Sequence, residues 1–176
     1  MEIILISGKA QSGKDTFANL LKKELKSKNK RVLITHYADL LKYIAKTFFD
    51  WNGKKDEYGR YLLQNIGTDV IRKENPNYWV NFINDMIGFC GNLYDYILIP
   101  DTRFPNEVDL VKKRYENKVM TIKMNRQNFE SKLTKEQQQH SSETALDDYM
   151  FDLIVYNNTL DELKQSAEKI SEILAK

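Results

Sequence analysis

Short apolar runs alternate with longer segments of helical periodicity along the chain. Continuous apolar runs predict buried strands at residues 3–7, 31–35, 96–100, 119–124 and 153–156. Apolar residues at helical spacing predict helices that begin near Thr16, after Asp39, near Tyr61, at Asn75-Pro76, at Pro105 and after Thr159. Strands that alternate with helices predict an α/β fold, in which helices flank a parallel β-sheet of about five strands.

Capping residues mark several of these helix starts. Asp39 is expected to cap the helix that follows it, and Asn75 to cap a helix with Pro76 in its first turn. Thr159 and Glu162 have the spacing of a capping box for the last helix.

Two polar stretches interrupt the periodic segments. Residues 50–59 contain Gly53 and Gly59 and are expected to form a loop. Residues 125–140 have little to bury, so they form either a lid over a ligand or a disordered excursion.

The composition is that of one globular domain without disulfides. The chain has 176 residues, 41% of them apolar, and its only cysteine, Cys90, excludes an internal disulfide and a thiolate zinc site. Glu2 and a short first apolar run do not fit a secretion signal, and no apolar run is long enough for a membrane span. We therefore expect a single domain, 1–176, in the cytoplasm and not at a membrane.

The charge is nearly balanced. The chain carries 27 basic and 25 acidic residues, for a net charge of +2. Such a small net charge gives no field that would attract nucleic acid, so we expect no nucleic-acid partner. Any binding of anions must be local.

The local candidate is a glycine-rich loop after the first predicted strand. The sequence GKAQSGK, residues 8–14, has the G-x-x-x-x-G-K spacing of a phosphate-binding loop, and it lies between a strand and an amphipathic helix as that motif requires. Backbone N–H groups of such a loop surround phosphate oxygens, and its lysine reaches the β and γ phosphates. We expect ATP to be bound by Gly8, Ala10, Ser12, Gly13, Lys14, Asp15 and Thr16.

One position departs from the usual motif. A serine or threonine that ligates Mg²⁺ normally follows the lysine, whereas this chain has Asp15 there and Thr16 one place later. Asp15 could bind Mg²⁺ itself, or it could cap the helix while Thr16 supplies the ligand. Asp101, directly after a predicted strand, is a third candidate for the ion or its water shell.

Arginines outside the loop are candidates for contacts with phosphate. Arg103 follows Asp101 closely, and a salt bridge between the two that only shapes the turn is the alternative. Arg126 opens the polar segment, where it could close over the transferring phosphoryl group. Arg60 and Arg72 could hold an acceptor phosphate or lie on the surface.

Seven short stretches of the chain are informative together: SGKDT (12–16), ADLLK (38–42), LQNIGT (63–68), NYWV (77–80), DTRFPNE (101–107), HSSE (140–143) and LDD (146–148). With these stretches the chain resembles the deoxynucleoside monophosphate kinases of tailed phages, some bacteria and large viruses. The resemblance covers nearly the whole chain. It implies a P-loop kinase fold with an acceptor region around residues 36–80 and a lid around 125–145, and transfer of the γ-phosphoryl of ATP to a nucleoside monophosphate. Animal phosphomevalonate kinases look similar at the loop, at Asp-Thr-Arg and at the late Ser-Glu.

Within this scheme each candidate residue has an expected role. We expect Lys14, Arg103 and Arg126 to act on the transferring phosphoryl group. Asp39, Lys42 and Asp101 are expected on the acceptor side. Lys42, with Arg103 or Arg72, is expected to pair with the monophosphate. Trp79 either stacks on the base or fills the core, because it belongs to a regular apolar stripe.

Two rival functions remain at this point. One is a kinase for a non-nucleotide acceptor, as in phosphomevalonate or dephospho-coenzyme A kinases, and the other is a nucleotide-dependent switch. The sequence also leaves the oligomeric state open, with a homodimer as one outcome.

Overall fold

A parallel sheet forms the centre of the computed structural model, which describes residues 1–127, 130–131 and 133–175. Within that part of the chain the sheet has five strands in the order β2-β3-β1-β4-β5, and every pair of neighbours is parallel. The strands are β1 (Glu2–Ser7), β2 (Val32–Ile34), β3 (Tyr96–Thr102), β4 (Val119–Asn125) and β5 (Leu153–Tyr156). The predicted fold class is confirmed.

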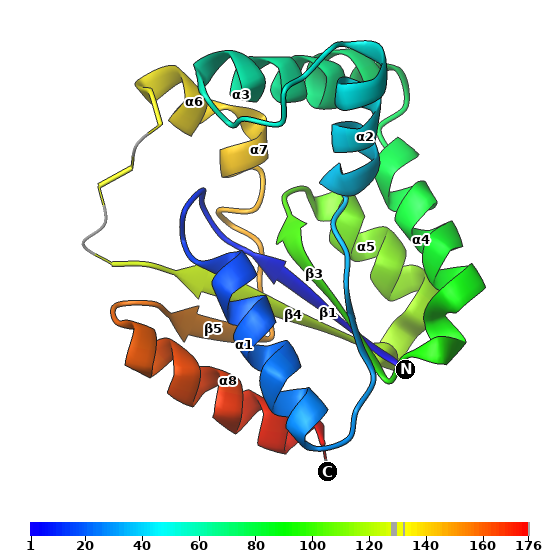
Figure 1. Cartoon of the computed structure of the whole chain (residues 1–176), viewed down its shortest axis with the longest axis vertical. Helices are drawn as coiled ribbons and strands as arrows, with labels where there is room; N and C mark the ends of the chain where they lie inside the picture. The colour runs from blue at the N-terminus through cyan, green and yellow to red at the C-terminus, as the bar shows by residue number, and fades with distance from the viewer. Residues whose placement is uncertain (128–129, 132, 176) are drawn as a thin grey trace.

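Helices cover both faces of the sheet, which explains the continuous apolar runs of its strands. Successive side chains of β1 point to opposite faces: Ile4 and Ile6 pack on one side, Ile3 and Leu5 on the other, and all four are fully buried. The first face is covered by α1 (Lys14–Ser27) and α8 (Leu160–Leu174), and the second by α4 (Tyr78–Cys90) and α5 (Pro105–Tyr115) (Figure 1).

A further group of helices lies beyond the carboxyl ends of the strands (Figure 1). It contains α2 (Ala38–Phe48), α3 (Glu57–Gln64), the π-helix η1 (Asn65–Arg72), α6 (Lys135–Gln139) and α7 (Ser141–Thr144). Two short 3₁₀ turns, η2 (Gly91–Leu93) and η3 (Glu116–Lys118), lead into β3 and β4. Ligand sites of open α/β sheets lie at this end of the sheet.

Three helix starts differ from the sequence prediction. Helix α2 begins at Ala38, so Asp39 lies in its first turn instead of capping it. Helix α4 begins at Tyr78 after Asn77, because a turn from Asn75 to Tyr78 comes first.

The third difference is α3, which begins inside the predicted loop 50–59. The Asp56 carboxylate caps it by accepting a hydrogen bond from Gly59 N at 2.8 Å. Because α3 continues directly into η1, the two together cover the helix that was expected to begin near Tyr61.

Other predicted ends are confirmed. Helix α5 begins at Pro105, and Thr159 Oγ1 accepts the Glu162 amide at 3.2 Å at the start of α8. Strand β3 runs two residues further than expected, so Asp101 is its second-to-last residue instead of following it. No helix in the described residues is long and apolar enough to cross a membrane.

Candidate active site

The glycine-rich loop joins β1 to α1, as predicted. Gly8 and Gly13 have φ angles of 143° and 93°, which L side chains rarely adopt. A Cβ atom on Gly8 would lie 2.5 Å from the Met124 carbonyl oxygen, and one on Gly13 would overlap the Asn157 side chain. That side chain donates from Nδ2 to Ser12 O at 2.9 Å. The loop therefore depends on both glycines for its shape.

Lys14 is bonded to its own loop. Its Nζ donates to the carbonyl oxygens of Gly8 and Lys9, both at 2.8 Å, and only 7% of the residue is exposed. Burial, with Arg103 nearby, lowers the pKa of Lys14 to about 7. Ser12 Oγ is buried and has no hydrogen-bond partner within the described part of the chain. Both side chains therefore offer hydrogen-bond donors within the loop: the Lys14 ammonium and the Ser12 hydroxyl.

Two cavities lie on either side of this loop. One, of about 470 Å³, is the Trp79 cavity, whose wall includes His36, Tyr37, Leu41, Leu63, Gln64, Thr68, Arg72, Trp79, Asp101, Arg103 and Phe104. The other, of about 440 Å³, is the Asn157 cavity, lined by Gln11, Gly13, Lys14, Asp15, Thr16, Arg126, Asn157, Asn158, Thr159, Leu160 and Leu163. Gln11, Lys14 and Asp15 line both, so the loop forms the partition between them.

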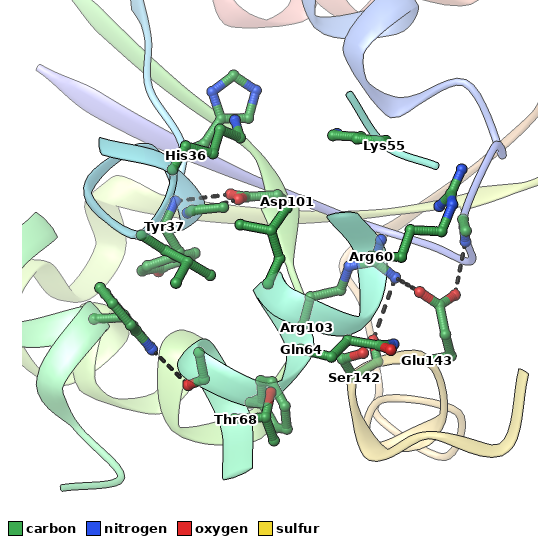
Figure 2. Close-up of a pocket in the computed structure, with 18 of the residues that line it drawn as sticks. His36, Tyr37, Lys55, Arg60, Gln64, Thr68, Asp101, Arg103, Ser142 and Glu143 are labelled. Carbon is green, nitrogen blue, oxygen red and sulfur yellow. Dashed lines mark hydrogen bonds and ion pairs between the residues drawn. The ribbon is translucent and has the colours of Figure 1, made fainter. Parts of the chain in front are cut away.

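Asp101 fixes the start of α2. Its Oδ1 accepts the Tyr37 amide at 2.9 Å and its Oδ2 the Ala38 amide at 3.0 Å. The alternative salt bridge between Asp101 and Arg103 is not formed, because Arg103 Nη1 pairs with Glu143 Oε1 at 2.7 Å. Figure 2 shows Asp101, Arg103, Gln64 and Thr68 among the residues that line the Trp79 cavity.

His36 links the loop to the acceptor side. Its Nε2 lies 2.9 Å from Asp15 Oδ1 and its Nδ1 3.3 Å from Asp39 Oδ2, while Lys42 Nζ lies 3.1 Å from Asp39 Oδ1. Burial alone would lower the pKa of His36, but its bonds to the two carboxylates raise it to about 9. His36 is therefore a cation at neutral pH.

The other three predicted arginines are divided between the two cavities. Arg60 and Arg72 both line the Trp79 cavity, and Arg72 Nη2 also forms a 2.6 Å ion pair with Glu107 Oε1. The Arg72 guanidinium stacks on the Phe104 ring, 3.9 Å from its centroid. Arg126 donates from Nη1 to Gln11 O at 3.1 Å and lines the Asn157 cavity.

Trp79 is a core residue at the edge of a cavity. Only 3% of it is exposed, and its Nε1 donates to Gly67 O at 2.9 Å, as expected of a core residue. It also borders the Trp79 cavity. Stacking on a base stays a prediction.

Comparison with known families decides the assignment. A family model described as "Deoxynucleotide monophosphate kinase" matches residues 34–167, well over half of the chain. The chain belongs to the deoxynucleotide monophosphate kinase family. It is a phosphotransferase that uses ATP to phosphorylate deoxynucleotide monophosphates, as the resemblance implied. The phosphate-binding loop precedes the matched residues, so it supports the assignment independently.

Solved structures agree on the fold of this kinase. APS kinase CysC of Mycobacterium tuberculosis, in its Cys556Ala mutant, has a TM-score of 0.54 at 12% identity, over 99% of this chain and 97% of that chain. A sugar kinase from Janibacter sp. has a TM-score of 0.54 at 8% identity, over 99% and 94%. Identities this low show a shared fold alone. No match was found among curated proteins.

The kinase has three important polar residues that sequence reasoning from motifs did not assign. His36 belongs to none of the motifs described above, although it follows β2 at the edge where ligands bind. Glu107 and Glu143 lie in two of the stretches that resemble the family, but neither was assigned a role. Their partners are distant in sequence, so spacing could not reveal the ion pairs.

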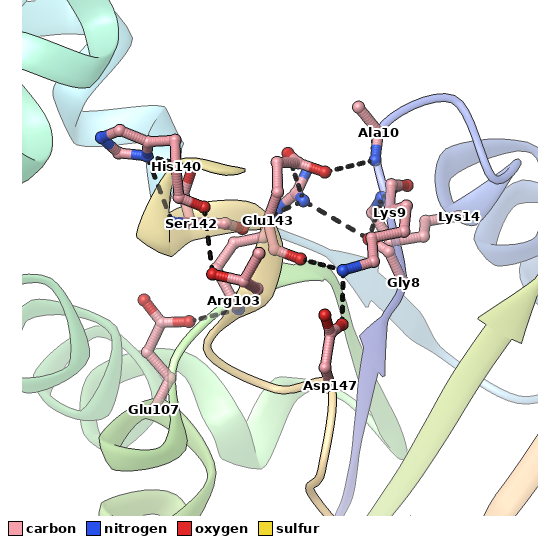
Figure 3. Close-up of polar contacts among 11 residues, drawn as sticks. Gly8, Lys9, Ala10, Lys14, Arg103, Glu107, His140, Ser142, Glu143 and Asp147 are labelled. Carbon is pink, nitrogen blue, oxygen red and sulfur yellow. Dashed lines mark hydrogen bonds and ion pairs between the residues drawn. The ribbon is translucent and has the colours of Figure 1, made fainter. Parts of the chain in front are cut away.

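Glu143 lies on α7, which packs against the loop (Figure 3). Its two carboxylate oxygens bond to Arg103 and to the Ala10 amide, both at 2.7 Å. Lys9 bonds to Glu143 O at 2.6 Å and pairs with Asp147. Helix α7 and Asp147 therefore cover one side of the phosphate-binding loop.

Glu107 anchors the other side of Arg103. Its side chain is 2% exposed, and its Oε2 accepts the amides of Arg103 at 2.7 Å and Phe104 at 3.1 Å. Burial raises the pKa of Glu107 to about 7, against the opposing effects of Arg72 and the backbone amides. This carboxylate thus ties Arg72, Arg103 and the start of α5 together.

We predict that Glu107→Ala lowers the free energy of unfolding by about 3 kcal/mol, because it leaves the buried Arg72 without its carboxylate. Urea unfolding at pH 8, above the raised pKa, measures this loss. Glu172→Ala, on the exposed face of α8, is the matched control and should change the value by less than about 0.5 kcal/mol. A loss at position 107 no larger than at position 172 would contradict the anchoring role.

Proposed function

We propose that the kinase holds ATP in the phosphate-binding loop and the Asn157 cavity and phosphorylates a deoxynucleoside monophosphate held in the Trp79 cavity. The observation that carries this arrangement is that Gln11, Lys14 and Asp15 line both cavities. A phosphoryl group bound at Lys14 is then next to both nucleotides, so it can pass directly from the donor to the acceptor. Such positioning supplies most of the catalysis in phosphoryl transfer.

The Asn157 cavity suits the donor nucleotide. It adjoins Gly13, Lys14 and Thr16 at the start of α1, where the helix dipole and free amides attract phosphates. Arg126 stands at its edge, held by the Gln11 carbonyl. We assign to Arg126 a contact with the donor phosphates or base.

The Trp79 cavity suits a nucleoside monophosphate. Its wall is apolar at Leu41, Leu63 and Trp79, as a base requires, and cationic at Lys42 and Arg60. Arg72 has its charge taken up by Glu107 and Phe104, which favours a role in shaping the wall and supporting Arg103.

The acceptor needs no general base. A monophosphate oxygen already carries negative charge, so the enzyme has to neutralise charge and align the two phosphates. Lys14, on the partition between the sites, and Arg103, in the wall of the Trp79 cavity, perform this task. Asp39 holds Lys42 and His36 in place on the acceptor side.

Magnesium fits at the start of α1. The Asp15 side chain is 71% exposed and Thr16 lies beside it in the Asn157 cavity, so a carboxylate and a hydroxyl oxygen are available. Mg²⁺ at kinase sites takes one or two protein ligands and fills the rest of its shell with phosphates and water. When bound, it would neutralise the phosphate charge. Asp101, whose two oxygens each accept an amide, is suited to the water shell of the ion.

The chain's organisation follows from these assignments. We propose one kinase domain over 1–176, with the acceptor region at about 36–80 and the lid at about 125–145. Residues 128, 129 and 132 of that lid lie outside the described residues. A cytoplasmic setting, the lack of a nucleic-acid partner and a homodimer remain predictions from the sequence.

Lys14→Ala should lower kcat by about 10²-fold or more, because one preorganised donor to the transferring phosphoryl group is lost. A coupled assay of ADP release measures this. Lys23→Ala, exposed on the same helix, is the control and should retain kcat within about twofold. Near-normal turnover by folded Lys14→Ala protein would reject the role of the loop.

The substrate class is tested by ADP release with the four common deoxynucleoside monophosphates, phosphomevalonate and dephospho-coenzyme A. We expect at least one deoxynucleotide to be phosphorylated more than about 10²-fold faster than either other acceptor, since a site built for one set of polar groups rejects ligands that leave them unpaired. EDTA should abolish the activity. Faster turnover with phosphomevalonate or dephospho-coenzyme A would overturn the acceptor assignment, and ADP release that no acceptor stimulates would favour the switch.

A further inference from the structure

The Glu143 carboxylate bridges two phosphate-binding groups. Its Oε1 lies 2.7 Å from Arg103 Nη1, and its Oε2 accepts the Ala10 amide at 2.7 Å. The side chain is 8% exposed, so water competes little for these bonds. A buried carboxylate next to a phosphate-binding loop needs an explanation, because its negative charge would repel the phosphates.

The backbone around Glu143 is fixed independently of that carboxylate. Lys9 Nζ donates to Glu143 O at 2.6 Å and pairs with Asp147, while His140 Nδ1 accepts the Ser142 amide at 3.2 Å at the start of α7 (Figure 3). Glu143 can therefore change its carboxylate contacts while α7 stays docked. An uncharged side chain of the same size should also leave α7 in place.

Arg103 has few other contacts that would orient its guanidinium. Its backbone is held by Glu107, but Nη1 reaches Gly8 O and Ser142 O only at 3.4 and 3.3 Å. The 2.7 Å ion pair with Glu143 is the shortest of these guanidinium contacts. A charge-assisted hydrogen bond of this length is about twice as strong as a neutral one, so it has the largest influence on where the guanidinium lies.

We propose that Glu143 is a positioning residue that aims Arg103 at the transferring phosphoryl group. Its second oxygen keeps the Ala10 amide bonded until a phosphate oxygen of ATP replaces it. The inference rests on the proposed function, in which Arg103 acts from the wall of the Trp79 cavity, next to the phosphate-binding loop. It assigns to α7 a part in catalysis that does not require contact with either nucleotide.

Glu143→Gln should affect kcat and ATP affinity differently. Glu143→Gln keeps the size of the side chain but removes the charge that orients Arg103, so kcat should fall about tenfold. ATP should bind at least as tightly as to the wild type, because a competitor for the Ala10 amide is weakened. Loss of a merely structural contact would instead weaken ATP binding and turnover together.

A double-mutant cycle tests whether Glu143 acts through Arg103. The full-length wild type, Glu143→Gln, Arg103→Ala and the double variant are compared in kcat by ADP release and in ATP affinity by calorimetry. We expect Glu143→Gln to cost about tenfold in the wild-type background and less than about twofold once Arg103 is absent. Glu172→Gln, exposed on α8 and equal in charge change, is the control and should retain kcat within about twofold.

Three outcomes would overturn the proposal: no loss of kcat in Glu143→Gln, the same loss in both backgrounds, or a parallel loss of ATP affinity. Each variant is assayed with whichever acceptor the wild type uses best. If that acceptor is not a deoxynucleotide, the substrate assignment fails. The role of Glu143 is still decided by comparing the loss of kcat that Glu143→Gln causes with Arg103 present and with Arg103 replaced by alanine.

Discussion

The parallel arrangement of the strands is the constraint on which the site depends. Because β2, β3 and β1 are neighbours and run in one direction, the residues after their carboxyl ends must meet at one edge of the sheet. Ser7 is paired with Thr102, which brings the phosphate-binding loop beside Arg103. Ile34 is paired with Leu98, which brings His36 and the start of α2 beside Asp101. Donor and acceptor sites share a wall for this reason.

Ion pairs hold the basic side chains at that edge of the sheet in place. Arg103 is paired with Glu143, Arg72 with Glu107, and His36 with Asp15 and Asp39. Lys14, with a pKa lowered to about 7, is bonded to loop carbonyls. Carboxylates thus hold the two arginines and His36 in place, and loop carbonyls hold Lys14, so that the donors to the phosphates are already oriented. Preorganisation of this kind avoids the cost of ordering the site during reaction.

The features that depend on local sequence could be predicted, and those that depend on distant partners could not. The loop at 8–14, the five strands and the cap at Thr159 follow from apolar periodicity and glycine spacing. Helix α3 and the π-helix η1 depart from that periodicity, since a polar stretch begins the first and π-helical turns are wider than 3.6 residues. Asp39 was misplaced as a cap because Asp101, 62 positions on in the chain, already satisfies the amides at the start of α2. The Glu143 pair spans 40 positions and arises only when α7 folds back on the loop.

The central claim is that one phosphoryl group lies between two nucleotide sites, beside Lys14 and Arg103. It is tested most directly by a crystal structure of the kinase with adenosine joined through five phosphates to a deoxynucleoside. The account predicts adenosine in the Asn157 cavity, the deoxynucleoside in the Trp79 cavity, and the phosphate chain crossing the loop with Arg103 in contact with it. A ligand that occupies only one cavity, or whose phosphates pass Arg103 without contact, would contradict the account.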